Sequence, residues 1–271
     1  MTIFRNIFLF FNEIFIKRHV IVQLVRSDFR NRYIGSFLGF LWALIQPMAM
    51  TFIFWFVFSR MWGAMQGPGG EPFLSYFITG FVAWNFFLES MLTSTLVFAE
   101  YSFLVKKVSF EISILPLVKI LSSFLFHCIF LVLAAILVLI KGASFSFYWI
   151  QLIYYIFALS CLIMGISWLT SSLQVFIKDI AQMVNVALQF GFWLTPIVWN
   201  ITMIQEPKIM IFLKLNPLLY IVDGYRKSML YKEPFWADIN GMAYFWSVTI
   251  IIMLIATLVF RKLKPHFADV L

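Results

Sequence analysis

Six runs of predominantly apolar residues follow one another along the chain. A helix needs about 20 apolar residues to cross the hydrocarbon core of a bilayer, and each run approaches or exceeds this length. The runs occupy residues 37–59, 73–99, 117–140, 148–175, 180–198 and 241–260. The pattern predicts an all-α membrane protein with six transmembrane helices, forming a single transmembrane domain over residues 1–271.

The segment before the first run has a different, two-faced pattern. In residues 17–33, apolar and polar side chains separate onto different faces of a helix. The apolar positions are Val22, Val25, Phe29 and Tyr33, and the polar ones are Arg18, Gln23, Arg26 and Arg30. This pattern is typical of an N-terminal amphipathic helix in the membrane interface, so residues 1–35 are predicted to be cytoplasmic or interfacial. A loosely structured basic tail is the alternative.

Residues 199–240 contain two further apolar stretches that are too short to span a bilayer. The stretches, 209–215 and 218–222, are separated by Asn216 and Pro217, and proline removes a backbone donor and breaks a helix. Broken helices are tolerated at membrane depth where protein surrounds the break. We therefore expect two short re-entrant helices that dip into the outer leaflet. Residues 100–116 form a loop that is long enough for a short helix.

Composition excludes an ordinary soluble domain. Apolar residues make up 63% of the chain and charged residues only 12%, whereas a soluble domain carries roughly 25% charge. The net charge of +8 reports orientation and contact with anionic membrane lipids, and it implies no nucleic-acid binding. With the N-terminus inside, thirteen of the twenty lysines and arginines fall in inside segments. Both termini, including the tail 261–271, are therefore predicted to be cytoplasmic.

The sequence carries no pattern for catalysis or for a resident cofactor. It has no GxxxxGKS/T phosphate loop, and the glycine-rich stretch 67–70 lacks the lysine that such a loop requires. It has no HExxH motif, and its three histidines lie far apart in sequence, which argues against a zinc site. Cys128 and Cys161 lie in apolar runs and are predicted to be packing residues. No catalytic, cofactor or metal residue is expected, and without a phosphate loop the chain is not expected to hydrolyse ATP alone.

Few ionisable side chains fall inside the predicted spans, and Glu89 and His127 are two of them. Glu89 lies in the second span, where an unpaired carboxylate costs about 2–3 kcal/mol at mid-membrane. The sequence leaves two interpretations open: a channel-lining or helix-pairing group, or a protonated or interfacial glutamate without a special role. His127, in the third span, is predicted to be a neutral packing or hydrogen-bonding histidine.

Aromatic residues make up 20% of the chain, and many cluster within the predicted spans. Trp and Tyr commonly form belts at the membrane interfaces, and most other rings simply face lipid or pack. Flat rings also suit the C–H faces of sugars, so an aromatic-lined channel for glycans is a second interpretation. Candidate channel residues are Trp42, Phe52, Trp55 and Phe56 in the first span, Phe190, Phe192 and Trp193 in the fifth, and Tyr220 and Tyr225 beyond it.

Four segments, in order along the chain, resemble one family of transporters. Residues 26–48 (RSDFRNRYIGSFLGFLWALIQPM) resemble the start of the first transmembrane helix in type-2 ABC exporter permeases for O-antigen, capsule or teichoic acid. Residues 175–199 (VFIKDIAQMVNVALQFGFWLTPIVW) are similar to that family's fourth-to-fifth helix turn and fifth helix. Residues 214–230 resemble its outer gate, and residues 261–271 resemble the tails of O-antigen exporters. Lys178 departs from the family pattern, in which arginine precedes the aspartate.

The resemblance implies a function for the whole chain. It implies a permease that forms a homodimer in the bacterial inner membrane and binds two copies of a soluble ATP-binding-cassette ATPase subunit. The implied cargo is a lipid-linked polysaccharide, most closely O-antigen, whose path the first and fifth helices line and whose exit residues 199–240 gate. Residues 100–116 are the implied coupling segment received by the ATPase, with Phe103, Lys106, Lys107, Phe110 and Glu111 as candidate contacts.

Arg26, Arg30 and Arg32 lie at the predicted cytoplasmic entrance, and arginine matches phosphate geometry well. They are candidates for binding the pyrophosphate headgroup, but positive-inside anchoring explains each of them at least as well. Two other functions stay open. One is a membrane enzyme acting on polyprenol-linked sugars, which needs clustered carboxylates or histidines; the other is an ion- or proton-coupled secondary carrier.

Overall fold

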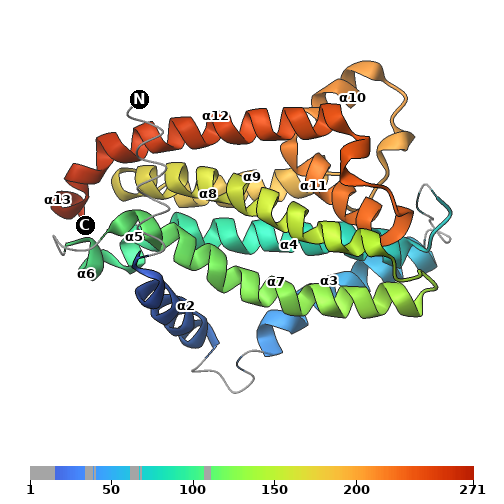
Figure 1. Ribbon diagram of the computed structural model, residues 1–271, viewed down its shortest axis with the longest axis horizontal. Helices are drawn as coiled ribbons and strands as arrows, with labels where there is room; N and C mark the ends of the chain where they lie inside the picture. Colours follow the sequence, from blue (N-terminus) through green and yellow to red (C-terminus); the bar gives the residue numbers. More distant parts are fainter. Residues whose placement is uncertain (1–15, 34–38, 40, 62–66, 68, 107–110) are drawn as a thin grey trace.

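The computed structural model describes residues 16–33, 39, 41–61, 67, 69–106 and 111–271 of the chain. Regular secondary structure in this part of the chain is helical, which confirms the predicted all-α class. Figure 1 shows the long helices running side by side along one axis, with α2 inclined to them near one end. The described residues therefore form one elongated helical bundle.

Twelve α-helices and several shorter turns make up the described part of the chain. The α-helices are α2 (Arg18–Tyr33), α3 (Leu41–Trp55), α4 (Phe73–Thr95), α5 (Val97–Glu100), α6 (Ser102–Val105), α7 (Leu115–Ile140), α8 (Leu152–Phe176), α9 (Ile180–Leu194), α10 (Pro207–Lys214), α11 (Pro217–Arg226), α12 (Ile239–Leu263) and α13 (Phe267–Val270). The π-helical turns are η1 (Phe56–Met61) and η5 (Lys227–Tyr231). The 3-10 turns are η2 (Ile112–Ile114), η3 (Phe147–Gln151), η4 (Ile201–Met203), η6 (Phe235–Ala237) and η7 (Lys264–His266).

The six predicted spans correspond to α3, α4, α7, α8, α9 and α12. Three helical stretches are long and apolar enough to cross a bilayer, namely Ile112–Ile140, Phe147–Phe176 and Ile239–Val270. α9 ends four residues before the predicted boundary, because Pro196 disfavours helical backbone at Thr195. Its 15 residues extend about 22 Å, less than the roughly 30 Å of bilayer hydrocarbon. These helices indicate a multi-pass membrane protein, and the number of six crossings stays a prediction.

α4 lies at the centre of the bundle. It packs against α7, α8, α9 and α11, and it is buried on all sides. Phe77, Ile78, Val82 and Phe86 are all buried although they point in different directions around the helix axis. A helix that is buried all round needs apolar residues on every face, so its sequence shows no amphipathic stripe.

Small residues and buried hydroxyl groups join α8 to its neighbours. A Cβ atom at Gly165 of α8 would lie 3.0 Å from Met253 Cγ of α12 and 3.3 Å from the Met253 backbone nitrogen. On another side, α8 contacts α4 through Ser94 Oγ and Ser167 Oγ, which lie 2.6 Å apart. Close approach and polar contacts of this kind hold helices together in lipid, where the surrounding hydrocarbon is as apolar as a leucine side chain.

The predicted N-terminal amphipathic helix is present as α2, but its contact face differs from the predicted apolar face. Ile21, Leu24 and Val25 pack against α7 and the turn before it, and Asp28 is buried as well. Val22, which was expected on the apolar face, is 64% exposed. The contact face includes Asp28, which forms an ion pair with Lys119 of α7. A prediction from apolar periodicity alone does not include such a charged residue in the buried face.

The two ends of the bundle carry different elements. α5, α6 and α13 lie together at one end, here called the α13 end, and α10 and α11 lie toward the other, here called the α10 end (Figure 1). The two short helices predicted in residues 199–240 are present as α10 and α11. Asn216 stands between them and accepts a hydrogen bond from Leu218 N at 3.0 Å, which starts α11. Their re-entrant position in a bilayer stays a prediction.

Gly224 lets α11 lie directly on α8. A Cβ atom there would come within 2.1 Å of Tyr155 Cε1, and the Tyr155 ring is itself buried. We expect Gly224→Ala to displace α11 and to destabilise the purified protein by about 1–3 kcal/mol, measured by thermal unfolding in detergent. The control is Gly191→Ala, whose Cβ atom would meet only the edge of Trp84 at 3.1 Å. Equal stability of Gly224→Ala and the parent protein would contradict this packing.

Candidate functional site

Five charged side chains from α2, α4, α5 and α7 contact one another in what is here called the α2 ion network (Asp28, Arg32, Glu89, Glu100 and Lys119). Arg32 Nη2 lies 2.9 Å from Asp28 Oδ2, and Arg32 Nη1 lies 3.0 Å from Glu89 Oε1. Lys119 Nζ lies 2.6 Å from Asp28 Oδ1 and also contacts Glu100. Because acidic and basic groups alternate, the network attaches α2 to three other helices.

The centre of this network is buried and ionised. The side chains of Asp28 and Lys119 are each only 4% exposed. Burial by itself raises the pKa of Asp28, but Arg32 and Lys119 outweigh it and hold this pKa below its ordinary value of 3.8. Removing one partner would therefore leave an uncompensated charge inside the protein.

The network also separates the three arginines predicted to bind a headgroup. Glu89 pairs with Arg32, which supports the helix-pairing interpretation of Glu89. Arg26 and Arg30 are exposed and share one face of α2, whereas Arg32 is largely buried. Position 32 points about 200° away from position 30 on the helix. The structure therefore keeps Arg26 and Arg30 together and places Arg32 inside the network.

The predicted coupling segment lies at the α13 end. Lys107 and Phe110 fall outside the described residues. Phe103, in α6, is 60% exposed, and Lys106 is exposed beside it. Glu111 instead accepts a hydrogen bond from Lys264 Nζ at 2.6 Å, so it joins this segment to the C-terminal tail. Phe103 and Lys106 are available to a partner, whereas Glu111 is held within the chain.

The C-terminal tail is folded onto the same end of the bundle. Phe267 of α13 is fully buried, and its ring contacts those of Phe98, Phe176 and Phe260 at centroid distances of 5.1 to 6.0 Å. Burial raises the pKa of Glu111, but the hydrogen bond and charge of Lys264 outweigh it and bring this pKa below its ordinary value of 4.5. Coupling segment and tail therefore form one surface.

Aromatic rings of α3, the turn η1 and α9 that lie at or near the surface are here grouped as the α3–α9 aromatic face (Phe52, Trp55, Phe56, Phe190 and Trp193). Phe52, Phe56, Phe190 and Trp193 are exposed, and Trp55 is half-buried. Trp42, near the start of α3, is exposed as well. An exposed apolar surface of this kind is covered by lipid or by another protein chain in the functional state.

Phe192 does not belong to the exposed part of this face. Its ring packs inward against Phe81 and Trp84, at centroid distances of 6.4 and 5.8 Å. It also contacts Phe54 of α3 at 5.7 Å, which joins α3 to α9. Phe192 thus positions the two helices that carry the exposed rings.

The two candidate tyrosines of α11 point in different directions. Tyr220 lines a cavity at the α10 end, and its hydroxyl lies 3.1 Å from that of Tyr154. Tyr225 is fully buried, with its hydroxyl 3.0 Å from His127 Nε2. Five residues along a helix place the two rings about 140° apart. Tyr225 therefore faces the interior rather than a channel, and His127 is a buried hydrogen-bonded histidine, as predicted.

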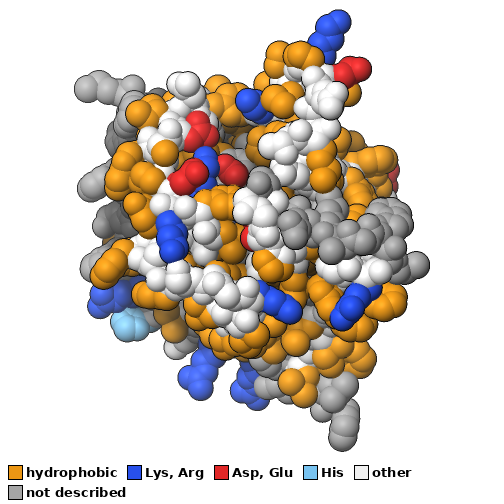
Figure 2. All heavy atoms as spheres, turned by 90° about the vertical axis from the view of Figure 1, so that its right-hand side faces the viewer, with side chains coloured by type: hydrophobic (Ala, Val, Ile, Leu, Met, Phe, Trp, Pro, Cys, Tyr) orange, Lys and Arg blue, Asp and Glu red, His pale blue; other side chains and the backbone are white. Residues whose placement is uncertain are grey.

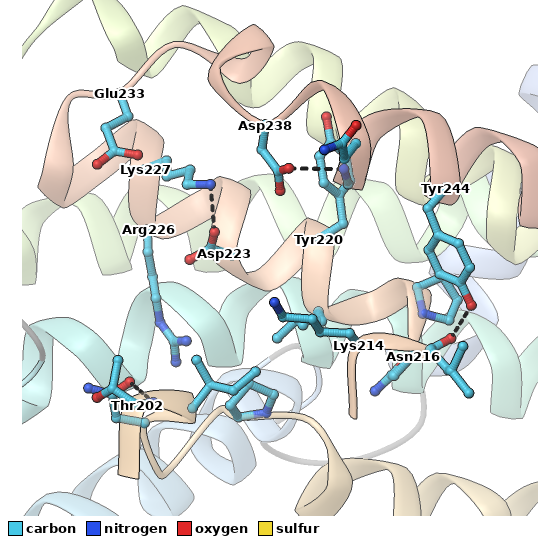
Figure 3. Close-up of a pocket in the computed structure, with 18 of the residues that line it drawn as sticks. Thr202, Lys214, Asn216, Tyr220, Asp223, Arg226, Lys227, Glu233, Asp238 and Tyr244 are labelled. Atoms are coloured by element: carbon cyan, nitrogen blue, oxygen red, sulfur yellow. Dashed lines mark hydrogen bonds and ion pairs between the residues drawn. The ribbon is translucent and has the colours of Figure 1, made fainter. Parts of the chain in front are cut away.

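The cavity at the α10 end has a volume of about 740 Å³ and is here called the α10-end cavity. Figure 3 shows polar side chains surrounding this space, and Figure 2 shows acidic and basic side chains close together on this end of the molecule. The charged lining residues are Lys214, Asp223, Arg226, Lys227, Glu233 and Asp238, and the aromatic ones are Tyr76, Tyr220, Tyr231 and Tyr244. The volume lies within the range of sites for small organic ligands.

Arg226 lines this cavity and attaches α11 to α4. Its guanidinium lies over the Tyr76 ring, 3.6 Å from the ring centre. It donates hydrogen bonds to the carbonyl oxygens of Tyr76 at 3.3 Å and Ile197 at 3.0 Å. Gly80 leaves room for it, since a Cβ atom there would lie 2.9 Å from Arg226 Nη2. Arg226 is therefore held as a buried cation by a ring face and two carbonyls.

Several of these residues have no place in the sequence-based predictions. Asp28, Glu100 and Lys119 are members of the α2 ion network. Arg226 lines the α10-end cavity and attaches α11 to α4. Two signals point to the network: the four-residue spacing of Asp28 and Arg32, and a lysine inside a predicted span, which needs a partner. No sequence signal identifies Arg226, because its partners are a ring and carbonyls brought together by folding.

The bundle and the sequence together define the class, a multi-pass helical membrane protein without a phosphate-loop motif. Residues 19–230 match the model of the ABC-2 type transporter family, and the chain belongs to this family. Three similar proteins are named O-antigen export system permease protein RfbA. Two, from Klebsiella pneumoniae, are each 28% identical over 93% of this chain and 95% of their own length. One, from Myxococcus xanthus, is 23% identical over 95% of this chain and 97% of its own.

Lys119→Met is expected to destabilise the protein by about 3–5 kcal/mol, because Asp28 stays charged and buried after losing one of its two cations. The double variant Asp28→Asn with Lys119→Met removes both charges and leaves the Arg32–Glu89 pair. It is expected to recover much of the loss in detergent-based unfolding of all three proteins. A double variant that is no more stable than Lys119→Met would show that the unpaired charge of Asp28 is not the cause of the loss.

The Glu111–Lys264 link predicts a pH-dependent tail. A carboxyl whose folded pKa is lowered stabilises the folded state above its unfolded pKa, and this contribution is lost as the pH falls through the folded value. We expect amide exchange in residues 264–270, corrected for intrinsic rates, to be slower near pH 6 than well below the ordinary value of 4.5. Glu111→Gln should exchange at the faster rate under both conditions; exchange as slow as in the parent protein near pH 6 would exclude a tether.

Proposed function

We propose that this chain is the membrane permease of an ABC exporter that moves lipid-linked polysaccharide, O-antigen in particular, across the bacterial inner membrane. The similarity to three O-antigen export permeases over nearly their whole length carries this proposal, together with the family match over residues 19–230. A subunit that provides a passage needs no catalytic site, so neither a phosphate loop nor an HExxH motif is required in its sequence.

Energy comes from a separate ATPase subunit, two copies of which bind a permease dimer. The chain has no phosphate loop, so it cannot bind and hydrolyse ATP in the usual way of such transporters. The α13 end supports the docking role, because Phe103 presents an apolar ring and Lys106 a charge beside it. The Glu111–Lys264 hydrogen bond joins the end of the coupling segment to the C-terminal tail that follows α12, which supports a connection between the docking surface and the bundle.

The polysaccharide passes between two copies of the chain. α3 and α9 each leave aromatic rings exposed, and two such faces turned toward each other enclose a passage lined by flat rings. Rings stack on the C–H faces of sugars of different kinds, which suits a polymer that must slide. The residues proposed for this contact are Phe52, Phe56, Phe190 and Trp193, and their exposure supports this role.

The α13 end faces the cytoplasm and the α10 end faces outward. The excess of lysine and arginine in the predicted inside segments supports this orientation. α10 and α11 then stand at the exit, in the position proposed for the gate. Arg26 and Arg30, exposed on α2, are the pair proposed to meet the pyrophosphate headgroup on the cytoplasmic side.

Reconstitution in liposomes tests the function as a whole. The chain together with its partner ATPase is expected to hydrolyse ATP and to move lipid-linked O-antigen, whereas the chain alone does neither. Transport by the chain alone, driven by an ion gradient, would establish a secondary carrier instead. Chemical conversion of the lipid-linked sugar would establish a membrane enzyme.

Phe103→Asp tests the coupling surface. The exchange places a charge in an exposed apolar contact, and we expect co-purification of the ATPase to fall at least about tenfold. Phe145→Asp is the matched control, because Phe145 is also an exposed phenylalanine but lies in the segment between α7 and α8, away from α6. Equal ATPase binding by both variants would remove Phe103 from the coupling surface.

A further inference from the structure

The α10-end cavity combines a rigid polar frame with side chains that have no partner. Tyr244 donates its hydroxyl to the Leu215 carbonyl at 2.7 Å, and Asp238 accepts from Gly241 N at 2.9 Å. Within the described residues, no hydrogen bond or ion pair involves the side chains of Lys214, Glu233 or Asn240, although all three line the cavity. A frame that is held in place and groups that are left unpaired are the features of a ligand site.

The charges of this cavity balance. Lys227 Nζ lies 2.8 Å from Asp223 Oδ2, so these two groups neutralise each other. The Arg226 guanidinium is already engaged by the Tyr76 ring and two carbonyls. Two unpaired charges of opposite sign remain, on Lys214 and Glu233. Asp238 is engaged at the start of α12, where it accepts a hydrogen bond from Gly241 N. An anion or a metal ion would find little net attraction, whereas a neutral ligand with many hydroxyl groups would find donors and acceptors of both kinds.

The cavity also offers aromatic surface. Four of the ten tyrosines of the chain line it. The ring of Tyr76 is covered by Arg226, but Tyr244 and Tyr231 are partly exposed. Figure 3 shows Tyr244, Lys214 and Asn216 near one another on one side of the space, with Glu233, Lys227 and Asp223 toward the other. Rings beside carboxylates, amides and ammonium groups suit a sugar, which has C–H faces and hydroxyl edges.

We propose that the α10-end cavity is a saccharide-binding site of each subunit, separate from the α3–α9 aromatic face, which holds a short stretch of the exported polymer. The proposal rests on the proposed export of polysaccharide and adds a second contact to it. A site at the exit would retain emerging sugars by hydrogen bonds to Lys214, Glu233 and Asn240. Because α10 and α11 form its walls, an occupied cavity would also stabilise one arrangement of these two helices.

The test is saccharide binding by the full chain in lipid nanodiscs, without the ATPase. The probe is lipid-free oligosaccharide released from the O-antigen of the source strain, titrated by calorimetry. We expect Lys214→Ala and Asn240→Ala each to weaken binding about tenfold, since each removes hydrogen bonds that the ligand alone would satisfy. Both side chains are exposed and without partners in the described structure, so the fold should tolerate the exchanges. Lys208→Ala is the matched control, because Lys208 is exposed on the same helix, α10, but does not line the cavity.

Three results would overturn the proposal: no binding to the parent protein, equal binding by all variants, or displacement of the oligosaccharide by inorganic phosphate, which would make the site an anion site. The same variants, assayed for transport with the ATPase, separate this inference from the function itself. Transport by the parent complex without oligosaccharide binding to the cavity refutes the saccharide site alone. Failure of the parent complex to transport O-antigen refutes the proposed function, whatever the cavity binds.

Discussion

Two arginines attach other elements to α4, one toward each end of that helix, and the functional surfaces depend on these attachments. Arg226 of α11 lies on the Tyr76 ring, and Arg32 of α2 pairs with Glu89. Positions 76 and 89 are about 20 Å apart along the helix. In lipid, packing of apolar side chains between helices gains little over contact with hydrocarbon, so polar attachments and close approach take over this role. α4, buried on every side, is the frame on which both ends of the molecule are built.

Among the residues that the structure describes, some charged groups have partners inside the chain and others have none. Asp28, Lys119 and Glu111 are paired and hold α2, the coupling segment and the tail in place. Arg30, Lys106 and Lys214 are exposed at the surfaces proposed to meet headgroup, ATPase and sugar. The division follows from the energetics of burial, because a buried charge is stable only beside an opposite charge or several groups that form hydrogen bonds or cation–π contacts with it. Arg30, Lys106 and Lys214 keep their charges in contact with solvent.

Clusters of aromatic residues in the sequence do not show which of their rings are exposed and which are buried. Phe190 and Trp193, three residues apart on α9, are exposed as a lining residue would be, whereas Phe192 between them packs inward. On α11, Tyr220 reaches a cavity and Tyr225 a buried histidine. Ring content identified these clusters as candidate channel groups, and their role in a channel stays a prediction. It did not separate their members, because a ring is equally apolar on either side of a helix and only the neighbouring helices decide which side is covered.

The sequence by itself determined the helical class, the order of the long helices, the two short helices around Asn216 and Pro217, and the resemblance to polysaccharide export permeases. These features follow from local hydrophobic length and from proline, which act within a few residues of the chain. Only the tertiary structure decided that Glu89 is a helix-pairing group and that Arg32 is separate from Arg26 and Arg30. It also decided that α10, α11 and α12 contribute to one cavity, whose lining holds equal numbers of acidic and basic residues. Each of these depends at least in part on side chains far apart in the chain, as in the 57 residues between Arg32 and Glu89. Charge complementarity and close packing act through space, so no window of sequence contains both partners.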